Sequence, residues 1–187
     1  MRVISGRNKG QRLLGPKDYE SRPTDDRVKE AVFNIIYPIK DSCIALDLFA
    51  CTGSIGIEFL SRGAKKVYFS ELKYDNIKIM EENLERTRFK EQSVILKGNF
   101  LKNLDLIEED IDYVYIDPPY ASGFYSKALD YISKSKYFAN SKIIVEADKD
   151  EDFSLVMEGL VRIFHRKYGK KEISIYERTH NESNLSR

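Results

Sequence analysis

From residue 44 onward the sequence alternates between short apolar stretches and longer amphipathic ones. The apolar stretches are rich in β-branched and aromatic side chains and therefore predict buried strands. The stretches between them repeat apolar residues three and four positions apart, which is typical of helices with one buried face. Strands that alternate with helices favour right-handed crossovers and a mostly parallel sheet with helices on both faces. The alternation therefore predicts an α/β fold.

The predicted strands are nearly continuous apolar runs, and they lie at 44–49, 66–70, 93–97, 111–116, 142–147, 161–168 and 172–177. Only Gly169-Lys170-Lys171 separates the last two, so these two must be antiparallel. Helices are predicted before Gly63, at 74–88 and at 124–133, with a short polar helix before the fourth strand. We expect a seven-stranded, mostly parallel sheet with an antiparallel last strand.

The N-terminal region precedes this alternation. Residues 2–6 and 11–15 predict a small β-hairpin around a basic turn. A helix with one apolar face follows, with Thr24 as its N-cap and Pro38 ending it. No linker rich in Pro, Gly or Ser divides the rest of the chain. We therefore expect a basic hairpin extension over residues 1–21 and one domain over 22–187.

Composition restricts the class of protein. A chain of 187 residues with 42% hydrophobic residues can form the core of one ordinary domain. No apolar run approaches the length of a membrane span, and the N-terminus lacks the apolar region of a signal peptide. Two cysteines exclude a disulfide scaffold, and two histidines give no metal-ligand cluster. We expect a soluble cytoplasmic protein without a metal or a membrane partner.

The net charge of +1 conceals an uneven distribution. Residues 1–17 hold five basic and no acidic side chains, and residues 162–187 hold seven basic and three acidic ones. The intervening 18–161 hold 19 basic and 27 acidic side chains. Attraction of a phosphate backbone depends on clustered positive charge, not on the total. The two basic ends therefore permit a nucleic-acid partner.

Polar motifs follow four of the predicted strands. Because the carboxyl ends of parallel strands meet at one edge of a sheet, we expect these motifs to line one ligand site. They are the loop from Asp47 to Gly56, which contains Phe49 and Gly53; Glu71; Gly98-Asn99-Phe100; and Asp117-Pro118-Pro119-Tyr120.

The first three motifs favour S-adenosylmethionine (SAM) as the cofactor. The Asp47 carboxylate would repel a pyrophosphate at the following helix, which argues against NAD, but it would attract the methionyl amino group of SAM. Glu71 can accept hydrogen bonds from both ribose hydroxyls. Asn99 can donate and accept at an adenine edge, with Phe100 as an apolar surface for the ring. We count Phe49 and Gly53 as further cofactor-binding residues.

The fourth motif suits methylation of an amino group. The Asp117 carboxylate and the Pro118 carbonyl can accept both N–H groups of an exocyclic amine and so direct its lone pair toward the methyl donor. Acceptors already in place strengthen as the amine gains positive charge. Proline keeps this loop stiff, and the Tyr120 ring can stack on an extruded base. Asp117, Pro118 and Tyr120 are therefore the candidate catalytic residues.

With these motifs in hand, the chain resembles the RsmD family of bacterial rRNA methyltransferases, which modify the N2 of a guanine in 16S rRNA. The resemblance rests on the opening residues 2–6, the segment 22–34, the Asp47 loop, the Asp117 motif, residues 144–146 and residues 167–169. It implies a Rossmann-like class I fold, SAM as the cofactor with S-adenosylhomocysteine as product, and rRNA of an assembling small subunit as the substrate. Two positions depart from the family pattern: Cys51 replaces a glycine and Asn99 an aspartate.

The resemblance also assigns the basic N-terminus to RNA binding. The expected RNA contacts are Arg7, Lys9, Arg12, Arg22, Thr24 and Arg27. We expect a monomer that binds 16S rRNA within small-subunit assembly particles. Two alternatives stay open, since the Asp117 motif fixes an amino group but not its carrier. One is methylation of adenine N6 in DNA or RNA, or of a protein amide; the other is a non-catalytic RNA-binding assembly factor.

Overall fold

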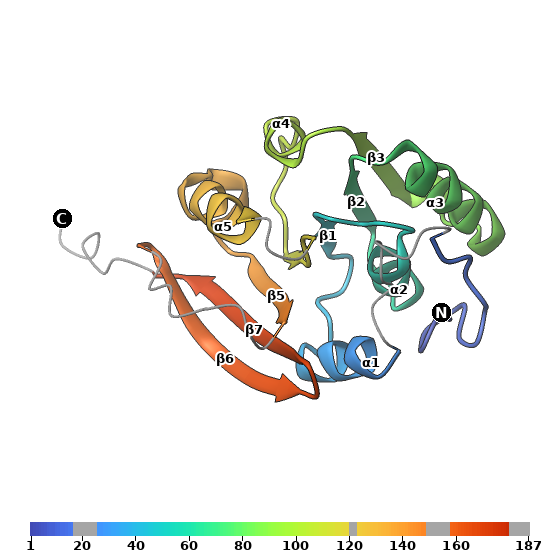
Figure 1. Ribbon diagram of the computed structural model, residues 1–187, viewed down its shortest axis with the longest axis horizontal. Helices are drawn as coiled ribbons and strands as arrows, with labels where there is room; N and C mark the ends of the chain where they lie inside the picture. Colours follow the sequence, from blue (N-terminus) through green and yellow to red (C-terminus); the bar gives the residue numbers. More distant parts are fainter. Residues whose placement is uncertain (17–25, 120–122, 149–157, 180–187) are drawn as a thin grey trace.

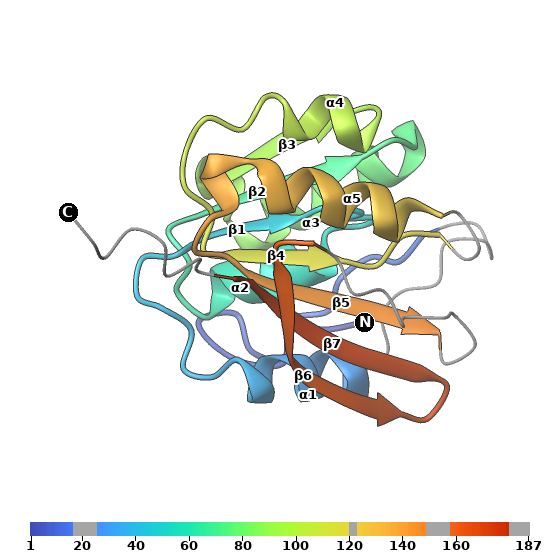
Figure 2. The same ribbon diagram turned by 90° about the vertical axis from the view of Figure 1, so that its left-hand side faces the viewer.

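The computed structural model describes residues 1–16, 26–119, 123–148 and 158–179. Its centre is a seven-stranded sheet in the order β3-β2-β1-β4-β5-β7-β6 (Figures 1 and 2). The strands are β1 (Ile44–Asp47), β2 (Lys66–Glu71), β3 (Ser93–Lys97), β4 (Tyr113–Ile116), β5 (Lys142–Asp148), β6 (Leu160–Tyr168) and β7 (Lys171–Arg178). The first five are parallel, and β7 is antiparallel to both β5 and β6. The predicted Rossmann-like fold class is confirmed.

In the part of the chain that the structure describes, five α-helices form layers on the two faces of the sheet. They are α1 (Asp26–Ile35), α2 (Ser54–Ser61), α3 (Tyr74–Thr87), α4 (Phe100–Leu104) and α5 (Phe124–Lys134). The first three share one buried apolar cluster, and α4 and α5 share the other (Figure 1). Each cluster collects alternate side chains of the strands, because successive residues of a strand point to opposite faces.

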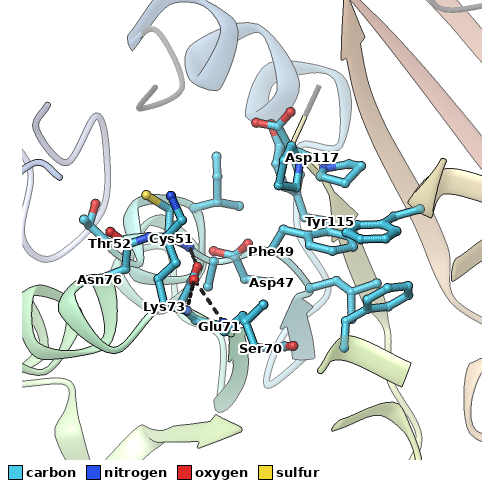
Figure 3. Close-up of a pocket in the computed structure, with 18 of the residues that line it drawn as sticks. Asp47, Phe49, Cys51, Thr52, Ser70, Glu71, Lys73, Asn76, Tyr115 and Asp117 are labelled. Atoms are coloured by element: carbon cyan, nitrogen blue, oxygen red, sulfur yellow. Dashed lines mark hydrogen bonds between the residues drawn. The ribbon is translucent and has the colours of Figure 1, made fainter. Parts of the chain in front are cut away.

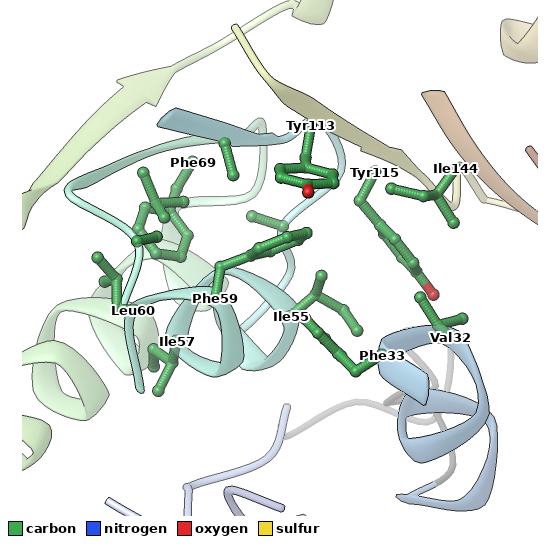
Figure 4. Close-up of a cluster of buried hydrophobic side chains, with 14 of the residues drawn as sticks. Val32, Phe33, Ile55, Ile57, Phe59, Leu60, Phe69, Tyr113, Tyr115 and Ile144 are labelled. Carbon is green, nitrogen blue, oxygen red and sulfur yellow. The ribbon is translucent and has the colours of Figure 1, made fainter. Parts of the chain in front are cut away.

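The face beneath α1 and α2 is closely packed. Phe59 of α2 contacts the rings of Phe33 and Tyr113, with ring centroids 4.7 and 5.5 Å apart (Figure 4). Gly56 lets α2 lie close to β2, since a Cβ there would lie 2.1 Å from the Phe69 ring. Lys29 of α1 is fully buried, and its ammonium donates to the carbonyl of Arg2 at 2.6 Å, which ties α1 to the N-terminus.

The two arms of the N-terminal extension pair antiparallel, over a shorter stretch than the sequence predicts. Its only β pairing among the described residues is an isolated antiparallel bridge between Arg2 and Arg12. The segment is held against the domain by the buried Glu58 carboxylate, which accepts from the backbone N–H groups of Ile4 at 2.7 Å and Ser5 at 3.0 Å. The two arms are joined by backbone hydrogen bonds from Val3 to Gln11 at 2.9 Å, from Gly10 to Val3 at 2.9 Å and from Leu13 to Met1 at 3.2 Å, so the expected hairpin is present as a short antiparallel pairing.

None of the helices in the described ranges is long and apolar enough to cross a bilayer.

Candidate active site at the carboxyl edge of the sheet

A cavity of about 790 Å³ opens at the carboxyl ends of the parallel strands. It lies where the strand order reverses between β1 and β4, which is the usual ligand site of open α/β sheets. Its polar side chains include Glu71, Asp47 and Asp117, which follow β2, β1 and β4 (Figure 3). Because these strands are neighbours in that order, Asp47 lies between the other two carboxylates. The predicted meeting of these motifs at one edge is observed.

Asp47 is the buried carboxylate at the end of β1. One of its oxygens accepts from the backbone N–H of Gly56 in the first turn of α2, at 3.0 Å. Burial raises the pKa of Asp47 to about 7, with the Glu71 charge acting in the same direction and the Gly56 hydrogen bond against it. Because burial disfavours the ionised form of Asp47, a cation bound beside it would stabilise that form.

The loop after β1 departs from regular geometry at two residues. Gly53 has φ 83°, and a Cβ there would lie 2.9 Å from Met80. Cys51 also has a positive φ, 48°, which a side chain other than glycine adopts with strain. Cys51 therefore keeps the backbone conformation of the glycine that it replaces in the family pattern. Gly53 itself is not among the cavity-lining residues, so its direct part in cofactor binding stays a prediction, whereas Cys51 lines the wall.

Glu71 joins the β1 loop to the β2 loop. One oxygen of its carboxylate accepts from the Cys51 N–H at 2.7 Å (Figure 3). The other accepts from the N–H groups of Leu72 at 3.0 Å and Lys73 at 2.7 Å. A carboxylate offers about four acceptor directions, so room for a further donor is limited. Glu71 thus has a structural task besides the ribose contact that its position predicts.

The third motif supplies a cap and an aromatic wall. Asn99 is the N-cap of α4, and its side-chain oxygen accepts from the Leu101 N–H at 3.0 Å. Its amide NH₂ is therefore the group left to meet a ligand, which is the donor part of the predicted donor-and-acceptor role. The Phe100 ring lies 5.0 Å from Phe49 and 5.1 Å from Phe124, centroid to centroid. All three rings line the cavity and form an apolar surface for a flat ligand.

Asp117 and Pro118 lie on the opposite side of the cavity, just after β4. The Asp117 side chain is 22% exposed. Burial and the Glu146 charge raise the pKa of Asp117 well above its ordinary value, while Lys171 acts against this rise. Tyr120 lies outside the described residues, so its stacking role stays a prediction.

Sequence reasoning missed a charged cluster next to Asp117. It consists of Tyr115, Glu146, Asp148 and Lys171. The signal for it was Glu146, an acidic residue inside the apolar stretch 142–147, because glutamate is seldom buried without a partner. The partner itself, Lys171, comes from a strand whose neighbours cannot be read from periodicity.

The predicted RNA-contacting residues have different environments. Arg7 is held on the protein, since its guanidinium donates to Gln92 at 3.1 Å and lies 5.1 Å from the Phe89 ring centroid. Lys9, Arg12 and Arg27 are exposed. Arg22 and Thr24 lie outside the described residues. The structure thus favours Lys9 and Arg12 over Arg7 as available charges on the extension.

The cavity as a whole suits an elongated ligand with several chemical parts. It offers a carboxylate for a cation at Asp47, acceptors at Glu71 and an aromatic wall at Phe49 and Phe100. Asp117 lies at the other end of this row of carboxylates, after β4. These groups fit SAM, whose amino group, ribose and adenine need a carboxylate, acceptors and an apolar surface. Among the described residues, no group of three His, Cys, Asp or Glu side chains is arranged to hold a metal ion.

Comparison with known proteins supports this fit. The sequence profile of a family described as Conserved hypothetical protein 95 matches residues 1–177. The chain belongs to this family. A Haemophilus influenzae relative named Ribosomal RNA small subunit methyltransferase D is 34% identical, over 81% of this chain and 80% of its own length. The Escherichia coli K12 protein of that name is 27% identical, over 83% of this chain and 79% of its own length. The expected membership of the RsmD family is confirmed.

Solved structures of similar proteins have the same architecture. The H. influenzae protein HI0767, described as a methylase, is 27% identical to this chain with a TM-score of 0.79, over 96% of this chain and 99% of its own. The E. coli protein yhhF, described as a methyltransferase, gives a TM-score of 0.84 at 24% identity, over 95% and 97% of the two chains. The second likeness shows the fold, and the family places this chain among methyltransferases.

Proposed function

We propose that this protein transfers a methyl group from SAM to the exocyclic N2 amine of a guanine in 16S rRNA of the assembling small ribosomal subunit. The observation that carries the proposal is the arrangement of three carboxylates along one cavity, Glu71, Asp47 and Asp117, at adjacent strand ends. Glu71 and Asp47 suit the cofactor, and Asp117 would face the methyl acceptor.

SAM bound here would supply an electrophilic methyl group. The Asp47 carboxylate would hold its amino group, and Glu71 its ribose hydroxyls. The Phe49 and Phe100 rings, which line the cavity, would cover its adenine. The Asn99 amide NH₂ would donate to a ring nitrogen of adenine, since the side-chain oxygen already caps α4. Together these contacts fix the cofactor along the edge of the sheet.

Asp117 and Pro118 would position the amine. The nitrogen lone pair of a base amine is delocalised into the ring, so the amine is a poor nucleophile. Two acceptors that hold both N–H groups direct that lone pair toward the methyl group and stabilise the positive charge that develops. A carboxylate and a proline carbonyl can do this, and Tyr120 would stack on the base.

Names of relatives support the choice of substrate. The H. influenzae and E. coli relatives are named as ribosomal RNA small subunit methyltransferases, which suggests 16S rRNA. The exposed Lys9, Arg12 and Arg27 would contact phosphates, and Arg7, Arg22 and Thr24 are further candidate contacts. A ribosomal substrate would place the protein in the cytoplasm, where we propose that it acts as a monomer on assembly particles.

The deciding experiment is methyl transfer from SAM labelled in its methyl group. Naked 16S rRNA, small-subunit particles from cells lacking this protein, and DNA would be compared as acceptors. The products would be identified by nucleoside mass spectrometry. We expect N2-methylguanosine from small-subunit RNA alone.

Other products would redirect the proposal. Labelled N6-methyladenosine, or label in protein, would keep the chemistry and replace the substrate. Binding of rRNA with no transfer to any acceptor would instead favour a non-catalytic assembly factor. Methylation of naked rRNA as fast as of particles would remove the assembly context from the proposal.

A further inference from the structure

A lysine at the start of β7 reaches three carboxylates beside the cavity, of which Asp117 and Asp148 line it and Glu146 is buried. The Nζ atom of Lys171 lies 3.6 Å from Oδ1 of Asp117, 3.4 Å from Oε1 of Glu146 and 3.4 Å from Oδ1 of Asp148. Among the described residues, the ion pairs of Asp117 all go to Lys171. The carboxylate proposed to position the amine thus has one described cationic partner.

Strand register brings these groups together. In the β5–β7 ladder Asp148 is opposite Lys171, and Glu146 is opposite Ile173. Residues opposite one another share a face, and so do residues two apart on a strand. Lys171, Asp148 and Glu146 therefore project from one face, the face on which Tyr115 of β4 donates its hydroxyl to Glu146. The common face of these side chains follows from the strand register and does not depend on a chance side-chain rotamer.

The cluster holds more negative than positive charge. Asp117 is faced by Glu146 from β5, by Asp47 from β1, by Lys171 from β7 and by Tyr115 of β4, whereas Asp148 contacts Lys171. Burial and the Glu146 charge raise the pKa of Asp117, and the Lys171 ammonium opposes this. Burial would lower the pKa of Lys171, but Asp117, Glu146 and Asp148 outweigh burial and raise that pKa to about 12. Lys171 therefore stays charged wherever the enzyme would work.

The charge state of Asp117 decides whether it can act. An ionised carboxylate only accepts hydrogen bonds, whereas a protonated one presents an O–H donor. The amine of a base also needs acceptors for both of its N–H groups. A protonated Asp117 would place one donor against another, and the amine would turn away from the productive geometry.

We propose that Lys171 is a positioning residue that holds Asp117 ionised and aimed into the cavity, with Glu146 and Asp148 fixing the lysine in place. The inference rests on the proposed function, because it assigns Asp117 the task of accepting from an amine. It does not require a particular nucleic acid. A merely structural lysine, which ties the β6–β7 turn to β5, would make the same contacts, so the test must separate the two roles.

Three variants make that separation. Lys171→Met removes the charge and keeps the length of the side chain. Lys171→Arg restores a cation. Lys170→Met changes an exposed neighbour in the same turn and is the matched control. For each variant, the ¹³C signal of the Asp117 carboxyl carbon would be followed from pH 4 to pH 10 in the protein without substrate, together with the unfolding temperature and the SAM dissociation constant.

We expect the midpoint of the Asp117 titration to rise by at least about one pKa unit in Lys171→Met and to stay near the wild-type value in the other two variants. The kcat for methyl transfer near neutral pH should fall about tenfold or more in Lys171→Met and recover as the pH rises. Lys171→Arg should retain most of the wild-type kcat. In all three variants the SAM dissociation constant should stay within about threefold of wild type.

An unchanged Asp117 titration in a folded Lys171→Met would overturn the inference. So would a loss of kcat that is the same at every pH, or one explained by a lower unfolding temperature. The titration needs no turnover, so it tests the effect of Lys171 on Asp117 separately from the proposed methyl transfer. A wild-type protein that transfers no methyl group would contradict the proposed function, while the response of Asp117 to Lys171 would still be measured.

Discussion

Asp47 and Asp117 are carboxylates of one cavity that differ in what holds them. Asp47 is fixed by a backbone N–H of α2 and has no ion pair with a cation among the described residues. Asp117 faces a lysine and a second carboxylate. The first environment leaves an acceptor that gains most from a cationic ligand, and the second already places a cation beside the acceptor. The two residues therefore suit different partners, a cationic cofactor group and a neutral amine.

Replacement of Asp117 should separate catalysis from cofactor binding. In Asp117→Ala the amine loses an acceptor, so we expect kcat for methyl transfer to fall roughly 100-fold or more. The SAM dissociation constant, measured by calorimetry, should change less than about threefold. Glu71→Ala is the matched contrast, with SAM affinity lowered about 10- to 100-fold, because a charged hydrogen bond is worth about 1.5–3 kcal/mol. Unchanged turnover in Asp117→Ala would remove this residue from the reaction.

The raised pKa of Asp47 predicts a pH-dependent cofactor affinity. Burial raises this pKa to about 7, so below pH 7 the carboxyl of the free protein is mostly protonated. A cationic amino group favours the carboxylate, and therefore SAM affinity should rise between pH 5.5 and 7 and binding should release up to one proton. Calorimetry at pH 6 in buffers of different ionisation enthalpy measures that proton. Asp47→Asn should abolish its release, and an equal release in the variant would assign it to another group.

At the scale of elements, the N-terminal extension is anchored as part of the domain. Val3 and Leu13 are buried in the α1–α3 cluster, and Met1 lines the cavity. Glu58 accepts from two backbone N–H groups of the extension, as well as from the Arg62 guanidinium at 2.8 Å. An element that contributes to both the core and the cavity wall positions its basic side chains more firmly than a free arm would.

Gly6 provides a test of this anchoring. It has φ 83°, and a Cβ would lie 1.9 Å from the carbonyl oxygen of Ser61, so no side chain fits without moving the extension away from α2. We expect Gly6→Ala to destabilise the protein by about 2 kcal/mol or more, which lowers the unfolding temperature by about 4–8 °C for a chain of this size.

Gly10→Ala is the control for that substitution. Gly10 has a similar φ of 85°, but nothing lies within 4 Å of its added Cβ. The difference between the two variants therefore measures contact with α2 and leaves out backbone strain. Equal effects of the two substitutions would mean that the extension is not held at Ser61.

The elements show how far the sequence could be read. Strands such as Ser93–Lys97 and helices such as Tyr74–Thr87 were predictable to within a residue, because burial imposes a clear period of two or 3.6 on their side chains. The extension was less predictable. Two of its backbone N–H groups donate to Glu58, which is distant in sequence, and periodicity does not report such a partner.

The same limit applies to the site. Asp47, Glu71, Asn99 and Asp117 could be found because each follows a strand, and parallel strands bring their ends together. The contact between Lys171 and Asp117 depends on β7 lying next to β5, which is a property of the complete sheet. The use of the Asn99 oxygen as a helix cap depends on local geometry that a residue type alone does not specify.

At the scale of the whole molecule, the basic extension runs from the cavity to the far end of α2. Met1 lines the cavity, whereas the N–H of Arg7 donates to Ser61, the last residue of that helix. Eight helical residues span about 12 Å. An RNA whose target base enters the cavity would therefore pass Arg12 first and Lys9 farther out. The net charge of +1 is compatible with RNA binding by the extension, because the acidic side chains include those that line the cofactor site.

This arrangement predicts different outcomes for the basic residues of the extension. Lys9→Ala combined with Arg12→Ala removes two exposed charges, so we expect RNA affinity to fall at low salt. The slope of log K against log salt should flatten by about one for each phosphate that these side chains neutralise in the wild-type complex. Arg7→Ala should chiefly lower the unfolding temperature, because Arg7 donates to Gln92 and to the carbonyl of Leu60.

The control for this experiment is Lys102→Ala combined with Lys127→Ala, which removes two exposed charges from α4 and α5 on the opposite face. Binding of labelled 16S rRNA fragments would be measured from 50 to 300 mM salt. If the Lys9 and Arg12 variant keeps the wild-type slope, or if the control is weakened as much, then the extension does not contact RNA. A general weakening in both variants would indicate attraction by net charge, since a defined contact surface depends on which charges are removed and not on their number.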